Sequence, residues 1–504
     1  MERFDAVVIG AGPEGLIAAH RLARDGLRVV VLERAPEPGG RAVTHEFHPG
    51  FRASPYADEL PLVPRRLLAS LNLAQHGGYF MPASASACFT SGRMTVLYKG
   101  ETCLARASSA FSAAGIAGLR RESVALRAGI AERATIAPAR ASRLAAWARP
   151  PRRLPWPGEA LARQSLDSVL ATHIPDAAMR AHFAAYLCMG RAVSPFLPGS
   201  ALHQLGGAGS GMPAGGMGGF TAALALSARA AGVHIRCGVE VRELRTVRNR
   251  VTGVVLQSGE VIDARAVVSS LDIKRTFAVL AGWSRNSDDR ARRVAHFRMG
   301  GGRARILFAL DRVPEFVPGL DDAVRGPLHV AEPLSALVEA HERWSAGIVG
   351  AKLPVTLRFP SLTDPRLAPM GKAVMTATLS CVPARMLDGA WDTEKRTRLM
   401  AQAIAAAAKF APGIVDSIVG FRVILPSEIE SALGLTDGDL DGGEIAPDQC
   451  LGFRPFAEWQ DGHTPIRGLY LGGPSSGASP FLTGASGEQA ALALLADCKT
   501  GLFL

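Results

Sequence analysis

The chain has 504 residues, of which 48% are hydrophobic and 20% charged, and its formal net charge is +11. This composition excludes a disordered chain. The chain is longer than a domain with a single hydrophobic core usually is, so we expect a globular protein with two or more domains. The basic excess alone does not indicate nucleic-acid binding, because no nucleic-acid-binding module accompanies it.

The first 33 residues predict a strand, a helix and a second strand. The apolar run 6–9 is typical of a parallel strand that is buried on both faces. The next segment has apolar residues at helical spacing and stops at Gly26. A second apolar run, 29–32, leads to Glu33. This order is typical of the beginning of a Rossmann-like α/β fold.

The turn after the first strand contains Gly10, Gly12 and Gly15 in G-x-G-x-x-G spacing. Such glycines permit a tight turn, a close approach of a pyrophosphate to the backbone, and close packing of helix on strand. The helix N-terminus favours the negative charge of the phosphates. Glu33 lies 18 residues after Gly15, where an acidic side chain accepts hydrogen bonds from a ribose. Together these residues predict a bound dinucleotide.

The segment 104–153 carries ten arginines and only two acidic residues. One interpretation is a solvated helical face. The other is a basic patch, with Trp147 and Trp156 among its arginines, that contacts an anionic membrane surface or an acidic partner.

The middle of the chain again has the sequence pattern of a nucleotide-binding domain. A glycine-rich loop precedes a predicted helix at 220–231 and a strand at 233–241, and a hairpin turns at Ser258 and Gly259. None of these glycines forms a second G-x-G-x-x-G turn, so the sequence predicts no separate nicotinamide nucleotide site.

The C-terminal part predicts a strand, Leu469–Leu471, an open turn at Gly472 and Gly473, and a helix at 484–495. A helix N-terminus that is reached through Thr483 and Gly484 is suited to stabilise negative charge, such as that on the pyrimidine edge of a reduced flavin.

Seven cysteines, at positions 88, 103, 188, 237, 381, 450 and 498, form no close pair. Their spacing excludes a C-x-x-C redox motif, argues against zinc and suits a reducing compartment. The first strand begins near Phe4, which leaves no room for a signal peptide, and no run of 18 apolar residues is present. We therefore expect a cytoplasmic protein.

These motifs resemble the FAD-dependent phytoene desaturase and flavin amine oxidase superfamily. The resemblance rests on the glycine turn, on "ERAPEPGGRA" and on the closing "GLYLGG…TGASGEQAA". The stretches "AVTHEFHPGFR", "AVVSSLDIKRTF" and "GDLDGGEIAPDQCLGFRP" point to the subgroup that includes pyridine nucleotide-disulfide oxidoreductase domain-containing protein 2. It implies noncovalently bound FAD as the dinucleotide.

The resemblance also implies roles for individual residues. The three turn glycines contact the pyrophosphate, Glu33 the adenosine ribose, and Arg34, Gly40 and Arg41 the ribose and phosphates. The backbone of Val241 lies against the adenine, and Gly473, Leu482 and Thr483 approach the flavin.

Two stretches depart from the family pattern. Pro13 and Glu14 stand in the turn where relatives often carry His-Asn, and "SSGASPFLTGASG" replaces a Thr-His-Pro-Gly run near the flavin. The disulfide-reductase name does not transfer, because the chain has no cysteine pair.

The expected architecture is a discontinuous FAD-binding domain, built from 1–60, 206–273 and 453–504. A mixed or helical substrate-binding domain, 61–205 and 274–452, is inserted into it. The inserted domain is rich in alanine and leucine and has few aromatic residues, which favours a hydrophobic substrate.

Three functions remain open. The first is an FAD-dependent oxidoreductase that dehydrogenates or desaturates a hydrophobic, isoprenoid-like small molecule. The second is an amine or amino-acid oxidase, which an aromatic cage would favour, although "FAEWQDGHTP" offers only Trp459. The third is a non-catalytic binder of hydrophobic ligands, which needs neither the glycine turn nor Glu33.

The chemistry beside the flavin is less defined. No catalytic acid or base can be named, although His203, His463 and Arg191 lie near predicted pocket loops. FAD reoxidation is expected to use oxygen, a quinone or a redox protein as acceptor. No nucleic-acid partner is expected, and a peripheral contact with an anionic membrane is a further hypothesis.

Overall fold

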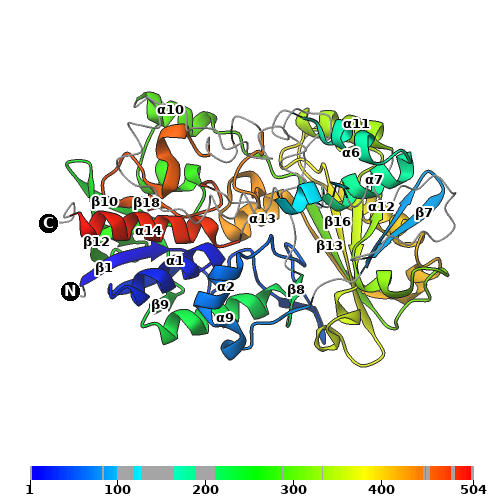
Figure 1. The fold of residues 1–504 in the computed structure, drawn as a ribbon, viewed down its shortest axis with the longest axis horizontal. Coiled ribbons are helices and arrows are strands. Elements are labelled where there is room, and N and C mark those ends of the chain that lie inside the picture. The colour runs from blue at the N-terminus through cyan, green and yellow to red at the C-terminus, as the bar shows by residue number, and fades with distance from the viewer. Residues whose placement is uncertain are drawn as a thin grey trace.

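The computed structural model describes residues 3–81, 85–98, 115, 118–119, 121–125, 164–187, 211–284, 288–331, 333–446, 449, 454–477 and 483–500. They form two large sheets that lie in opposite halves of the molecule, with both ends of the described chain in the first half (Figure 1). The arginine-rich segment 104–153 falls almost entirely outside these residues, so its role stays a prediction.

The first sheet has seven strands, in the order β10-β11-β12-β1-β2-β9, with β18 also paired to β12. Its strands are β1 (Arg3–Ile9), β2 (Val29–Glu33), β9 (His234–Cys237), β10 (Val241–Val247), β11 (Arg250–Leu256), β12 (Val261–Ser269) and β18 (Leu469–Leu471). β18, β12, β1, β2 and β9 pair in parallel, and β10–β11–β12 form an antiparallel meander. Strands from three distant parts of the sequence thus share one sheet.

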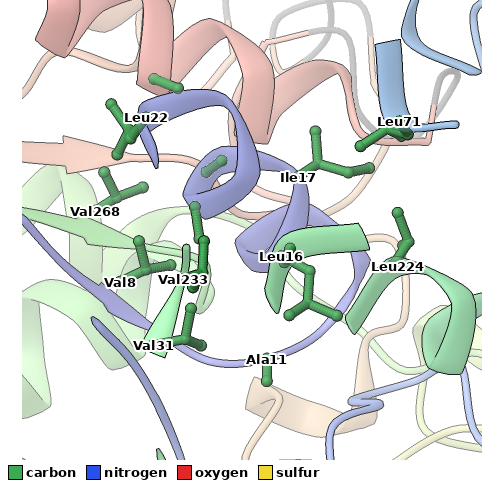
Figure 2. Packing of buried hydrophobic residues seen from close by; sticks show 14 of the residues in the cluster. Val8, Ala11, Leu16, Ile17, Leu22, Val31, Leu71, Leu224, Val233 and Val268 are labelled. Carbon is green, nitrogen blue, oxygen red and sulfur yellow. The ribbon is translucent and has the colours of Figure 1, made fainter. Parts of the chain in front are cut away.

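Three helices cover one face of this sheet: α1 (Pro13–Arg24), α9 (Met217–Ala230) and α14 (Ala485–Lys499). Figure 2 shows Leu16 and Leu22 of α1 on the side of the sheet residues Val8, Val31 and Val268, whereas Ile17 points toward Leu71. The helix forms because its apolar residues recur at helical spacing, and their burial provides its stabilisation.

The predicted N-terminal strand, helix and strand are all present, as are the hairpin with its turn at Ser258 and Gly259 and the strand Leu469–Leu471. The predicted single strand at 233–241 is wrong. Its first part, β9, pairs with β2, whereas β10 pairs with β11, and Gly238 separates the two with a positive φ of 72°. One continuous strand could not pair with both partners.

The second sheet also has seven strands, in the order β17-β13-β16-β15-β14-β6-β7. These are β6 (Ala85–Thr90), β7 (Arg93–Tyr98), β13 (Arg303–Leu310), β14 (Leu328–Val330), β15 (Val355–Arg358), β16 (Ala373–Ser380) and β17 (Ile418–Ile424). One face of the sheet packs against α12 (Thr393–Ala407). Among the described residues, this half also contains the helices α6 (Leu166–His173), α7 (Ala177–Leu187) and α11 (Leu334–Ser345).

The opposite face of β13 and β16 meets elements that lie toward the first half. Leu307 and Val374 pack against Phe51 of β4 (Phe51–Ala53) and Ile429 of α13 (Pro426–Leu433). β4 pairs with β3 (His45–His48).

Buried polar contacts reinforce this junction. Arg305 of β13 forms an ion pair with Asp58 at 2.5 Å, and Arg358 of β15 pairs with Glu59. Asp364 accepts a hydrogen bond from the amide of Gly215 at 2.6 Å. Because these pairs are largely buried, removal of one partner would leave an uncompensated charge. The segment 54–59 is therefore firmly held on the second sheet.

The smaller described elements are α2 (Arg65–Leu71), β5 (Phe80–Met81), β8 (Met212–Pro213) and α10 (Asp289–His296). Leu67 and Leu71 of α2 belong to the core of the first sheet. The domain boundaries expected from the sequence, including the one after residue 60, stay a prediction. Within the described part of the chain, no helix is long and apolar enough to span a membrane.

Candidate functional site

A cavity of about 440 Å³ opens where β1 and β2 end and α1 begins. Seven residues with a predicted cofactor role line it: Gly10, Gly12, Glu33, Arg34, Gly40, Arg41 and Val241. The carboxyl ends of parallel strands are the usual place for ligands in open α/β sheets.

The glycines shape the floor of the cavity. Gly12 is the N-cap of α1, with no side-chain cap and Pro13 at the first helical position. A Cβ on Gly40 would lie 3.2 Å from the Cα of Gly12, so these two backbones approach closely. Gly15 lies behind the cavity, where a Cβ would come within 2.0 Å of the Gly10 carbonyl oxygen. Gly15 is therefore required for packing, and Gly12 and Gly40 leave a free helix N-terminus facing the cavity.

Glu33 is held in place at the end of β2. One carboxylate oxygen accepts a hydrogen bond from the amide of Ala11 at 2.7 Å, and the other from the amide of Ala35 at 2.8 Å. Each oxygen keeps a further lone pair that can accept a ribose hydroxyl.

Arg34 and Arg41 reach across the cavity to one later segment of the chain. Arg34 donates to the carbonyl oxygen of Ala432 at 2.7 Å, and Arg41 donates to that of Leu440. The same segment supplies the cavity wall 432–435. We call residues 426–440 the covering segment.

The covering segment is anchored from beneath by Asp272, whose side chain is fully buried. The carboxylate accepts hydrogen bonds from the amide of Thr436 at 2.9 Å, from its hydroxyl at 3.1 Å, and from the amide of Arg275 at 2.9 Å. Burial raises the pKa of Asp272, although these hydrogen bonds oppose the shift. Arg275 itself lines the cavity beside Arg34 and Arg41.

Sequence reasoning missed Arg275, Tyr56 and the wall 432–435 as lining residues. "KRTF" and "ALGL" carry no spacing that indicates a site. The quoted stretch "AVVSSLDIKRTF", which includes Asp272 and Arg275, was the only signal that could have led to one of them.

Of the residues expected near the flavin, Gly473 and Thr483 are described, and neither is among the residues that line this cavity. A Cβ on Gly473 would lie 2.3 Å from the carbonyl oxygen of Leu271, and the adjacent Pro474 lines the cavity. Thr483 is buried and bonds the carbonyl oxygens of Pro61 and Leu62, through its hydroxyl and its amide. Leu482 lies outside the described residues.

The N-terminus of α14 differs from the expectation. Glu14 on α1 accepts hydrogen bonds from the amides of Gly484 and Gly487, at 2.8 and 2.9 Å. The helix N-terminus that the sequence placed toward a reduced flavin therefore donates the amides of Gly484 and Gly487 to a carboxylate of α1.

Of the three residues considered for catalysis, only His463 is described. Its Nε2 lies 3.3 Å from Asp497, near the end of α14, and its ring packs against Tyr470. It does not line the cavity. Trp459, the single candidate for an aromatic cage, is buried against Phe277 and Phe456 in the core beneath the first sheet.

FAD fits the cavity by its chemistry. A diphosphate finds a free helix N-terminus and three arginines, and a ribose finds the oriented carboxylate of Glu33. Because Gly12 and Gly40 carry no side chains, the space beside them at the helix N-terminus is free for the diphosphate.

Replacing Glu33 with alanine should lower FAD affinity by roughly 10- to 100-fold, because a charge-assisted hydrogen bond contributes about 1.5–3 kcal/mol. The flavin-to-protein absorbance ratio after dialysis measures this loss. Glu37→Ala is the matched control, since Glu37 is an exposed acid at the same cavity. Full flavin retention in Glu33→Ala would contradict the placement of the ribose.

Comparisons with known proteins agree with FAD as the cofactor. Residues 5–298 match the family model DAO, described as FAD dependent oxidoreductase. The chain is 28% identical to rat (Rattus norvegicus) pyridine nucleotide-disulfide oxidoreductase domain-containing protein 2, over 98% of this chain and 94% of that protein. It is 26% identical to a lycopene-forming phytoene desaturase from Pseudescherichia vulneris, over 98% of this chain and 99% of that protein.

A solved structure shows the same fold. An engineered triple mutant of putrescine oxidase superposes with a TM-score of 0.60 at 16% identity, covering 99% of each chain. The family match covers more than half of the chain and contains the glycine turn, Glu33 and Val241. The protein belongs to the FAD-dependent oxidoreductase (DAO) family.

Proposed function

We propose that this FAD-dependent oxidoreductase dehydrogenates a hydrophobic small molecule of the isoprenoid class. The observation that supports the proposal best is the similarity to a phytoene desaturase along 98% of the chain, including the second half. The alanine- and leucine-rich composition of residues 61–205 and 274–452 agrees with an apolar substrate.

In such a reaction the substrate loses a hydride and a proton from adjacent carbons, and a carbon–carbon double bond forms. FAD, when bound, supplies the hydride-accepting chemistry. The described residues would bind and orient the cofactor: the α1 N-terminus and the arginines would hold the diphosphate, and Glu33 would hold the ribose. The covering segment supplies one wall of this cavity.

An amine or amino-acid oxidase is the second candidate, because this fold also occurs in putrescine oxidase. That likeness shows the fold alone at 16% identity. Trp459 is buried in an aromatic core cluster and is thus withdrawn from any cage that would recognise an amine. A non-catalytic binder is the weakest candidate, because it has no use for an oriented Glu33.

The acceptor that reoxidises FAD is proposed to be oxygen, a quinone or a redox protein. Among the described cysteines, Cys88 and Cys381 are buried, and burial raises the pKa of each thiol to about 12. Such thiols are poor nucleophiles, so these two are unsuited to carry electrons by disulfide exchange. A peripheral contact of residues 104–153 with an anionic membrane is the proposed route to a lipid-soluble substrate.

Anaerobic reduction of the bound flavin distinguishes the candidates. Liposomes that contain phytoene should bleach the flavin absorbance, whereas putrescine and free amino acids should not, because the proposed pocket is apolar. Empty liposomes are the control. Bleaching by an amine, with none by the hydrocarbon, would reverse the order of the two enzyme candidates.

A further inference from the structure

Glu14 is a buried carboxyl group whose role the cofactor site does not explain. It is the second residue of α1, and its side chain is only 5% exposed. Its two oxygens accept hydrogen bonds from the amides of Gly484 and Gly487. A Cβ on Gly487 would lie 2.1 Å from the Glu14 carbonyl oxygen, so the two helices touch at this point.

The same residue also lines the cofactor cavity, together with Gly10, Gly12 and Arg41. Burial raises the pKa of Glu14, while the α14 amides and the charge of Arg41 lower it by smaller amounts. A carboxyl group that is costly to ionise thus lies beside the turn that receives the diphosphate.

A diphosphate adds two negative charges to this cavity. Like charges in a poorly solvated site repel strongly, and a nearby anion favours the neutral form of a carboxyl group. The covering segment supplies one wall of the cavity, residues 432–435, so part of the diphosphate site is bounded by protein and not by water.

We propose that Glu14 takes up one proton from solvent when FAD binds, so that the cofactor binds most tightly to the protein with a neutral Glu14. Since binding then consumes a proton, FAD affinity falls as the pH rises above the pKa of Glu14 in the free protein. Below that pKa the carboxyl is already neutral, and the affinity becomes independent of pH. The proposal rests on FAD binding and does not depend on the substrate.

Other charged groups face the same region. The cavity is also lined by the acids Glu33, Glu37 and Glu240, by His45 and Tyr56, and by Arg34, Arg41 and Arg275. On α14, Glu488 lies 3.8 Å from Arg21 of α1. His45 requires its own variant, because protonation of an imidazole would favour an anion in the same pH direction.

Titration calorimetry of the apoprotein with FAD tests the proposal. At each pH between 6 and 9, two buffers with different ionisation enthalpies report how many protons are taken up. The wild type should take up protons within this range, and its FAD affinity should fall as the pH rises there, by at most about tenfold per pH unit. Glu14→Gln should take up none and show a flat affinity.

Two variants serve as comparisons. Glu488→Gln neutralises a largely buried carboxyl on the neighbouring helix α14. Burial raises the pKa of Glu488 as well, and this variant should behave as the wild type. His45→Gln should keep the proton uptake that depends on Glu14. Circular dichroism confirms that each variant is folded.

Proton uptake is measured on the wild type alone, so the proposal can be tested even if Glu14→Gln does not fold. Wild-type binding without proton uptake across this range would overturn it, as would unchanged uptake in folded Glu14→Gln. Failure to find an isoprenoid substrate would leave these results unaffected.

Discussion

Replacing Gly12 with valine is expected to give a folded protein that has lost most of its FAD. Gly12 has φ −72° and ψ 173°, a backbone conformation that valine adopts readily. A Cβ there has only the Cα of Gly40 within 4 Å, at 3.9 Å. The side chain therefore fits the fold but occupies the diphosphate position, and overpacking of about 1–3 kcal/mol lowers affinity by roughly 5- to 150-fold.

The flavin-to-protein absorbance ratio and the thermal midpoint together separate this effect from misfolding. Gly413→Val is the matched control, because no atom lies within 4 Å of its Cβ position and it does not line the cavity. Gly15→Ala should instead destabilise the fold itself, since its Cβ would collide with the Gly10 carbonyl. Wild-type flavin content in Gly12→Val would refute the assigned diphosphate position.

The second large effect is loss of stability in acid through two buried histidines that lie in and beside the second sheet. His182 on α7 is fully buried and bonds the hydroxyls of Thr95 and Ser86, at 2.8 and 3.1 Å. Burial lowers its pKa from 6.5 to about 3. Burial also lowers the pKa of His329, which lies 6.0 Å from the His182 ring.

The sign follows from proton linkage. As the pH falls below 6.5 the unfolded chain binds a proton at His182 and the folded chain does not. The free energy of unfolding should therefore fall by about 1.4 kcal/mol per pH unit from this residue, until the pH reaches its folded pKa of about 3.

Urea unfolding between pH 7 and 4 measures the effect as a difference between wild type and His182→Asn, whose stability should depend less on pH. Burial raises the pKa of Asp439 to about 6, which opposes the trend below that pH but is common to both proteins and cancels. His234→Asn, at an exposed position, is the control. Parallel pH profiles for His182→Asn and the wild type would contradict the assignment.

The predictable part of the site is the part whose residues lie close together in the sequence. Gly10 to Glu33 carry a strand, a turn, a helix and a carboxylate at fixed spacing, and each needs only its neighbours to form. The fold class followed for the same reason, because the strand and helix signals of the first sheet are strong within short windows.

The rest of the site depends on contacts between distant residues. Glu14 meets Gly484 across 470 positions of sequence, and Arg41 meets Leu440 across 399. No local pattern encodes such partners. The unusual Pro13-Glu14 pair marked a departure from the family pattern, but only the structure shows where that carboxylate binds.

The first sheet also constrains how the protein can be made. β1 pairs with β12 and lies two strands from β18, and α1 is covered by α14. At roughly 5–20 residues per second, the ribosome needs on the order of 25–100 s to extend the chain from β1 to α14. During that time the apolar faces of β1 and α1 lack their final cover, so this N-terminal segment stays open to non-native contacts until the last strand and helix are made.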